Sequence, residues 1–141
     1  MKKQVLISTT LCLVVGLAMV SANAQTGGVK AKVPFGFTVS GQTLPAGDYR
    51  MIARPRQLNI EDGHGKIVAM VLANDLSGRS AGANGRIVFH CYGERCFLAE
   101  VWASTLDNGR GVVTSRAEQD LAREEKGKYF AVLGEELPKS R

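Results

Sequence analysis

Residues that could carry chemistry gather in one stretch of the sequence, RIVFHCYGERCFLAEVW, at positions 86–102. His90, Cys91 and Cys96 could together bind zinc or copper, because both metals accept imidazole and thiolate ligands. The alternation of side chains along a strand opposes this interpretation, since His90 and Cys91 would point to opposite faces of the sheet. We therefore expect no metal site and no cofactor, and interpret the two cysteines as a disulfide pair.

The two cysteines flank a predicted β-hairpin turn. Gly93 supplies the positive φ that the first central residue of a type II′ turn requires, and Glu94 is the second central residue. This turn places Cys91 opposite Cys96 in a pair without direct hydrogen bonds, whose Cα atoms approach to about 4.5 Å and can be bridged. The sequence thus predicts a Cys91–Cys96 disulfide that locks the turn.

Polar side chains on the other face of this hairpin form a candidate binding patch. His90 and Tyr92 would share that face with Arg95, as a site for a polar ligand or as a general-base pair. The alternative, which we favour, is an ordinary sheet face on which His90 packs across the strands against Phe97. The candidate ligand-facing residues, with no catalytic residue among them, are His90, Tyr92, Arg95, Glu100 and Trp102.

Glu100 is the least expected residue of the hairpin. An uninterrupted register places it on the Ile87 side among apolar neighbours, where a carboxylate is costly unless it has a partner. The pattern does not identify that partner, because Arg86 points to the other face. We favour a structural ion pair over catalysis, since structural networks also perturb carboxylates.

Two further groups of charged residues lie close together in the sequence. Glu61, Asp62 and His64 could bind a cation or exchange protons, although a polar turn is the commoner explanation. The second group is a basic cluster formed by Arg50, Arg54 and Arg56. The sequence contains no Gly-x-Ser-x-Gly, phosphate-loop or Cys-x-x-Cys motif, so we do not expect an enzyme.

The N-terminus has the pattern of a cleaved signal peptide, predicted at residues 1–24. Lys2 and Lys3 precede an apolar run at 5–20, which ends in the small-residue site at 22–24. A retained membrane anchor is the alternative. Cleavage leaves two cysteines in an oxidising compartment, where a disulfide is expected. We expect a periplasmic or secreted protein with no stable membrane insertion after cleavage.

The rest of the sequence alternates short apolar runs with turn residues. This pattern predicts one mostly β domain, an antiparallel β-sandwich or partly open barrel with one C-terminal surface helix. The run at 67–72 is apolar on both faces and is expected to be a central strand buried on both sides. Ser115 and Glu118 form a capping box that begins a helix at about 115–126, with Gly127 as its C′ residue.

The predicted domain has short ends outside its folded part. The β-domain spans 33–133, with a flexible leader at 25–32 and a frayed tail at 134–141. Residues 74–85 form a long loop rich in small and polar residues, which is either a functional lid or a mobile segment.

Four stretches form a set that is fairly specific as a combination: VPFGFTV (33–39), LPAGDY (44–49), VFHCYGERCFLAEVW (88–102) and SRAEQDLA (115–122). Together they resemble a family of small exported bacterial β-rich proteins of unknown function. The resemblance covers most of the chain after the signal peptide. It implies export, and it assigns no established fold, activity, ligand or site residue.

The sequence is compatible with three functions. The favoured one is an exported, non-enzymatic β-module that interacts with an envelope component or a protein partner. No nucleic-acid partner is expected, because the net charge of +5 includes the two lysines of the signal peptide. The alternative is a carrier of a small apolar ligand, and the least favoured is an enzyme that uses His90 or His64. The residues expected to line the carrier cavity are Phe35, Phe37, Phe89, Leu98 and Trp102.

Overall fold

The computed structural model describes residues 26–78, 85–103, 106 and 109–140. The predicted signal peptide lies outside these residues. Strands dominate the described chain, and the expectation of a mostly β domain with a single helix is confirmed. In chain order the elements are β1 (Thr26–Val33), β2 (Phe37–Val39), β3 (Gln42–Leu44), β4 (Gly47–Arg54), β5 (Gln57–Glu61), β6 (Ile67–Leu76), β7 (Gly85–Tyr92), β8 (Arg95–Trp102), β9 (Gly109–Val112), α1 (Arg116–Glu124) and β10 (Lys128–Ser140).

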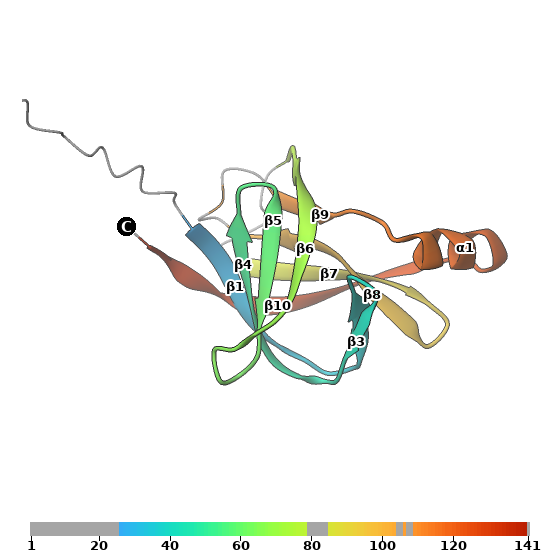
Figure 1. The fold of residues 1–141 in the computed structure, drawn as a ribbon, viewed down its shortest axis with the longest axis horizontal. Helices are drawn as coiled ribbons and strands as arrows, with labels where there is room; N and C mark the ends of the chain where they lie inside the picture. The colour runs from blue at the N-terminus through green and yellow to red at the C-terminus, as the bar shows by residue number, and fades with distance from the viewer. Residues whose placement is uncertain (1–25, 79–84, 104–105, 107–108, 141) are drawn as a thin grey trace, which may run out of the picture.

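Eight of the strands close into an antiparallel barrel (Figure 1). The order around the ring is β8, β7, β10, β1, β4, β5, β6 and β9, and β9 pairs back to β8 where Glu100 meets Gly111. The short β2–β3 hairpin lies outside the ring and joins β8 through a parallel contact between Thr38 and Phe97. The sheet that the sequence predicts as a sandwich or a partly open barrel is therefore a closed barrel.

The described parts of the predicted flexible leader (25–32) and frayed tail (134–141) are residues 26–32 and 134–140. They belong to strands, so the two predictions are wrong there. β1 pairs with β10 on one edge and with β4 on the other, and Val29 at its centre is fully buried. The glycines of these segments predicted mobility, but in the structure they allow neighbouring strands to pack closely. A Cβ on Gly28 would collide with the backbone of β4, and one on Gly134 would collide with Val29.

β6 is buried on one face only, which corrects the expectation that 67–72 is buried on both. Ala69 and Ala73 are buried, whereas Met70 and Leu72 are 58% and 68% exposed. The barrel wall is a single sheet, so the outer face of this strand has no second layer to cover it.

The loop predicted at 74–85 is shorter than expected. β6 continues to Leu76 and β7 begins at Gly85, so both ends of the range belong to strands. Residues 79–84 lie outside the described part of the chain, and the expectation of a lid there stays a prediction.

Aromatic and aliphatic side chains fill the barrel interior. The Phe89 ring centroid lies 5.0 Å from that of Phe35 and 5.2 Å from that of Phe37, both in edge-to-face contacts. Phe37 also meets Tyr49 edge-to-face, at 5.1 Å. Phe37, Phe89 and Leu98 are almost completely buried. Three of the five residues that were expected to surround a ligand, Phe35, Phe37 and Phe89, therefore pack against one another.

The helix α1 begins where the capping box predicts. Ser115 Oγ accepts a hydrogen bond from the backbone amide of Glu118 at 3.2 Å. The helix ends at the extended residue Glu125, and Gly127 lacks the left-handed φ that a C′ glycine needs, so that part of the prediction is wrong. Gly127 instead lies against the imidazole of His90, with no room there for a Cβ.

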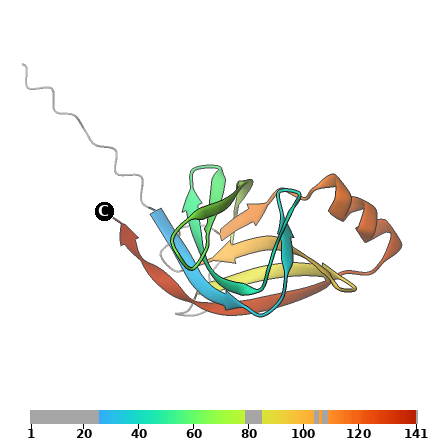
Figure 2. The ribbon, with the colours of Figure 1, turned by 60° about the horizontal axis from the view of Figure 1, so that its bottom comes forward.

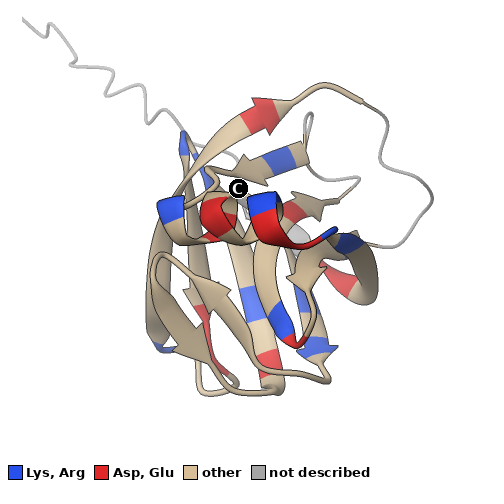
Figure 3. Cartoon of the chain, turned by 90° about the vertical axis from the view of Figure 1, so that its right-hand side faces the viewer, with Lys and Arg blue, Asp and Glu red and all other residues tan. Residues whose placement is uncertain are grey.

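The helix lies at one end of the barrel, at the end where the β7–β8 hairpin turns (Figure 2). Figure 3 views this end and shows acidic and basic residues interspersed along α1. Among the described residues, no helix is long and apolar enough to cross a membrane.

Candidate functional site

The hairpin turn has the predicted geometry. Gly93 has a φ of 58°, and Glu94 is not among the residues with positive φ, as a type II′ turn requires. Cys91 lies opposite Cys96, with Cα atoms 4.0 Å apart, and the two sulfur atoms are bonded. The predicted disulfide is confirmed, and it is compatible with an oxidising compartment.

A β-bulge changes the register farther from the turn. The predicted pairing holds for the four pairs nearest the turn, but Val88 then pairs with Glu100, and Ala99 is left as the extra residue. Glu100 therefore lies opposite Val88 and not on the Ile87 side, which corrects the sequence prediction. It shares the outer face of β8 with Trp102, whose Nε1 donates to Glu100 Oε2 at 2.7 Å. This hydrogen bond supplies the missing partner.

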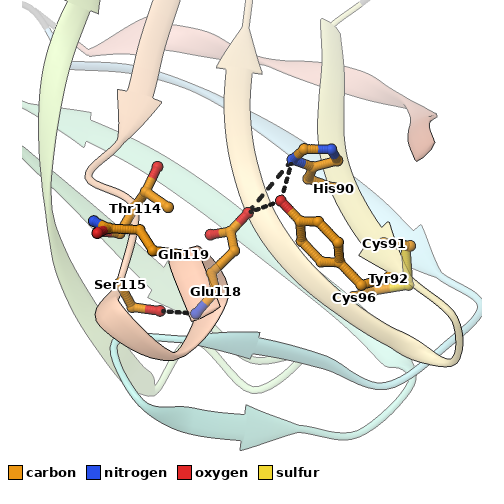
Figure 4. Close-up of polar contacts among 8 residues, drawn as sticks. All are labelled: His90, Cys91, Tyr92, Cys96, Thr114, Ser115, Glu118 and Gln119. Carbon is orange, nitrogen blue, oxygen red and sulfur yellow. Dashed lines mark hydrogen bonds and ion pairs between the residues drawn. A yellow bond between two sulfur atoms is a disulfide. The ribbon is translucent and has the colours of Figure 1, made fainter. Parts of the chain in front are cut away.

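Three side chains meet where the outer face of β7 faces α1, and we call them the His90–Tyr92–Glu118 cluster (Figure 4). Tyr92 Oη lies 2.9 Å from His90 Nδ1 and 3.4 Å from Glu118 Oε1. His90 Nδ1 lies 3.5 Å from the same carboxylate oxygen. Tyr92 has one hydroxyl proton, so when it donates to Glu118, His90 Nδ1 must carry the proton that donates to Tyr92. The cluster is then a continuous hydrogen-bonded chain from imidazole to carboxylate.

Burial perturbs the two acids of this cluster. Glu118 is only 7% exposed. This burial raises the pKa of its carboxyl, while His90 and the hydrogen bond from Tyr92 act in the opposite direction. Burial also raises the pKa of the Tyr92 hydroxyl, and the neighbouring Glu118 carboxylate adds to that shift. Glu118 thus takes up a proton more readily than an exposed glutamate does.

Aromatic contacts hold the imidazole of His90 in place. Tyr129 of β10 stacks on it, with ring centroids 4.2 Å apart and planes 8° apart. Phe97, the partner expected from the sequence, is opposite His90 in the register, but its ring meets Tyr92, with centroids 6.1 Å apart. His90 therefore packs against Tyr129 of β10, the strand that pairs with the other edge of β7. The sequence of the hairpin alone does not indicate this contact.

The structure divides the predicted patch into separate parts. His90 and Tyr92 belong to the cluster, while Glu100 and Trp102 form a hydrogen-bonded pair farther along the hairpin. The remaining member, Arg95, is exposed at the turn, and its guanidinium lies over a phenylalanine ring, 5.6 Å from the centroid.

A surface hollow of about 180 Å³ connects the two parts of the patch. His90 and Glu118 line it together with Glu100, Thr114 and Tyr129. The lining therefore includes two carboxylates and no lysine or arginine. In the part of the chain that the structure describes, no group of three or more His, Cys, Asp or Glu residues is arranged to hold a metal ion.

A larger hollow, of about 500 Å³, lies over β1, β4 and β10. Its lining includes Lys30, Arg50 and Glu135, which the strand register places side by side, with Lys30 in the middle. Arg50 Nη1 also lies 3.3 Å from Glu61 Oε2 on β5. Across β10, β1, β4 and β5 the charges are thus negative, positive, positive and negative, so each basic residue has an acidic neighbour. Arg50, a member of the predicted basic cluster, is engaged in this ion pair.

The sequence group Glu61, Asp62 and His64 has a structural role. Asp62 Oδ1 accepts hydrogen bonds from the backbone amides of Lys66 and His64, at 3.0 and 2.9 Å. These hydrogen bonds, the one from Lys66 first, hold the pKa of the Asp62 carboxyl below its ordinary value. Because Glu61 is paired with Arg50, the structure favours the polar-turn interpretation of this group.

Sequence reasoning missed Glu118 as a site residue. The capping box identified its position in the helix, and its backbone amide does donate to Ser115. Its side chain, however, turns toward β7 rather than back toward the N-cap. No local pattern indicates this, because the contact joins residues 26 or more positions apart in the sequence.

Comparison with known proteins does not place this chain in a family: no protein-family model, no curated protein and no solved structure matches it. The resemblance to exported β-rich proteins therefore stays a prediction.

Proposed function

We propose that this protein is an exported, non-enzymatic β-barrel module that binds a protein or another envelope component through the outer wall of its barrel. The distribution of apolar side chains supports this proposal most strongly. Packed rings fill the interior, while several large apolar residues face outward from the strands. Contiguous apolar surface on a small protein commonly marks an interaction site.

Three outward-facing residues form an apolar surface that we call the β6 patch: Met70, Leu72 and Val113. They are 58%, 68% and 49% exposed. The Val113 amide donates to the Leu72 carbonyl at 3.2 Å, which brings these two segments of the chain together. On β5, Asn59 pairs with Met70 and Gln57 pairs with Leu72. Gln57 Nε2 donates to Asn59 Oδ1 at 2.6 Å. Asn59 is buried and Gln57 is half-buried, so Gln57 gives the patch a polar border on the β5 side, as at the rim of a protein interface.

Export is supported by two observations that do not depend on each other. Residues 1–24 have the pattern of a signal peptide. The Cys91–Cys96 disulfide suits an oxidising compartment. The proposal accordingly places the protein in the periplasm or outside the cell.

Carriage of an apolar ligand is the alternative that the structure favours less. The rings of Phe35, Phe37 and Phe89 occupy the space that the ligand would need. Trp102, the fifth residue expected in that cavity, lies on the outer face of β8, with the guanidinium of Arg86 5.3 Å from its ring centroid. We therefore assign the interior to stability and the outer wall to binding.

Catalysis by His90 is also less well supported than a structural role. His90, Tyr92 and Glu118 hydrogen-bond to one another and in doing so attach α1 to the hairpin. We assign the cluster to anchoring the helix against the barrel.

The proposal is tested by capture from envelope extracts of the native host with immobilised, disulfide-bonded mature protein. Leu72→Lys introduces a charge at the centre of the β6 patch. Ala122→Lys introduces the same charge at an exposed position on α1, outside the strands that carry the two apolar surfaces. We expect wild type and Ala122→Lys to retain the same partner. Leu72→Lys should bind it at least about tenfold more weakly, because the complex would bury an unpaired charge. Equal capture by all three proteins would contradict the proposal.

A further inference from the structure

Half of β10 has a neighbouring strand on one edge only. β7 pairs with β10 from Lys128 to Gly134. β1 pairs with β10 only from Glu135 onward, because the rest of β1 follows β4. No described residue pairs with the second edge of Tyr129–Leu133, which we call the β10 edge. In Figure 2, this half of β10 runs beside β7 toward α1.

The β10 edge is apolar and exposed. Tyr129, Phe130 and Leu133 are 68%, 49% and 70% exposed, and Ala131 between them is exposed as well. Natural edge strands are usually protected by a charged residue, a proline or a bulge. Residues 129–133 contain neither a charge nor a proline, and their pairing with β7 is regular. Such an edge presents backbone amide and carbonyl groups to an added strand.

We propose that two copies of this protein join their β10 edges as an antiparallel pair centred on Ala131. In this register Ala131 faces its own counterpart, and Tyr129 faces Leu133 of the second copy. On the opposite face of the joined sheet, Phe130 meets Val132. The two barrels then share one continuous sheet, and the backbone groups of both edges are hydrogen-bonded.

Charge identifies the second copy as the occupant and sets the direction. Lys126 and Lys128 precede the edge, and Glu135 follows it. Antiparallel pairing brings the basic end of each copy beside the acidic end of the other, whereas parallel pairing brings like charges together. A two-fold pair also occupies both edges, so the assembly closes as a dimer.

This surface is separate from the β6 patch. β10 and β6 are four strands apart in both directions around the ring. The inference therefore does not depend on the proposed function, and a substitution can affect either surface alone.

The test is sedimentation velocity of the mature, disulfide-bonded protein over a concentration series, with Ala131→Lys, Ala131→Glu and an equimolar mixture of the two. We expect the wild type to be dimeric at high concentration and to dissociate on dilution. Each variant alone should be monomeric, because two like charges then face each other across the axis. The mixture should form a heterodimer, because opposite charges then meet. Leu72→Lys is the control and should dimerise like the wild type.

A wild type that is monomeric throughout, variants that dimerise as the wild type does, or a mixture that stays monomeric would each overturn the proposal. Ala131→Cys provides a second measurement that changes the side chain very little. The two-fold register predicts an intermolecular disulfide at this position on mild oxidation, and none for Leu72→Cys. A failure of Ala131→Cys to link faster than Leu72→Cys would also overturn it.

Discussion

At the scale of single residues, Glu118 determines how the helix is attached. Its backbone amide completes the N-terminal cap at Ser115, and its side chain reaches Tyr92 and His90 on the barrel. One residue thus contributes both to the start of α1 and to its position against β7. The sequence predicts the first contribution, because capping is local, and cannot predict the second, because it depends on packing between distant segments.

The raised pKa of Glu118 predicts a pH dependence of stability. The folded protein binds this proton more tightly than the unfolded chain, so the contribution of Glu118 is greatest below its ordinary value of 4.5 and decreases as pH rises through the raised value. Glu118→Gln removes this ionisation. We expect the unfolding free energy of the variant minus that of the wild type to increase between about pH 4 and pH 7. Urea unfolding, monitored by circular dichroism at each pH, measures this difference in unfolding free energy.

Asp62→Asn provides a control for which the difference in unfolding free energy should change with pH in the opposite direction. The pKa of Asp62 is lowered, so its contribution to stability is present above its ordinary value of 3.8 and is lost as pH falls through the lowered value. The difference between variant and wild type should therefore become more unfavourable as pH rises across that interval. If the Glu118 and Asp62 variants changed in the same direction, the environment assigned to Glu118 would be wrong.

At the scale of elements, the hairpin shows how far local reasoning extends. Turn chemistry at Gly93 gives the correct pairing of the four nearest residue pairs, because a tight turn fixes register directly. The bulge at Ala99 was not predicted, since it depends on where β8 must bend to meet β9. The environment of Glu100 could therefore not be derived from alternation alone.

The ends of the domain show a different limit. Glycine-rich and polar composition predicted a mobile leader and tail, yet both segments are barrel strands. The alternation of Val29, Ala31 and Val33 was present in the sequence and indicates a strand. The pairing that stabilises it joins the first and last strands of the described chain, and such long-range contacts leave no local signal.

Removal of the disulfide should weaken the protein without changing its fold. The loop between Cys91 and Cys96 is short, with a sequence separation of 5. The chain-entropy model therefore assigns it only about 2 kcal/mol. We expect the Cys91→Ala/Cys96→Ala double variant to lose about this much unfolding free energy in urea and to keep the circular dichroism spectrum of the wild type. Free thiols in non-reducing peptide mapping of the exported wild type would contradict the assignment.

At the scale of the whole molecule, the sequence predicts a mostly β domain with one helix but not the closure of the sheet. Closure depends on a short contact between β8 and β9, where Glu100 and Val101 meet residues of β9. Closure leaves β6 with an apolar outer face, whereas the apolar pattern of the sequence at 67–72 predicted burial on both faces. The exposed apolar residues that support a binding function thus become visible only once the barrel is assembled.

Two surfaces on opposite sides of the barrel account for the exposed residues Met70 and Leu72 of β6 and for those of the β10 edge. The β6 patch is assigned to a partner and the β10 edge to a second copy of the chain. A dimer joined at β10 would present two β6 patches, and binding at two sites strengthens attachment to a surface that carries repeated partners.

The most direct test is site-specific photo-crosslinking in cells of the native host, with the photoreactive residue at Leu72 and, as the matched position, at Leu133. The proposed function predicts that Leu72 forms a covalent adduct with a different protein or envelope component, and that Leu133 does not form this adduct. The absence of any adduct at Leu72 in folded, exported protein, or the same adduct at both positions, would contradict it.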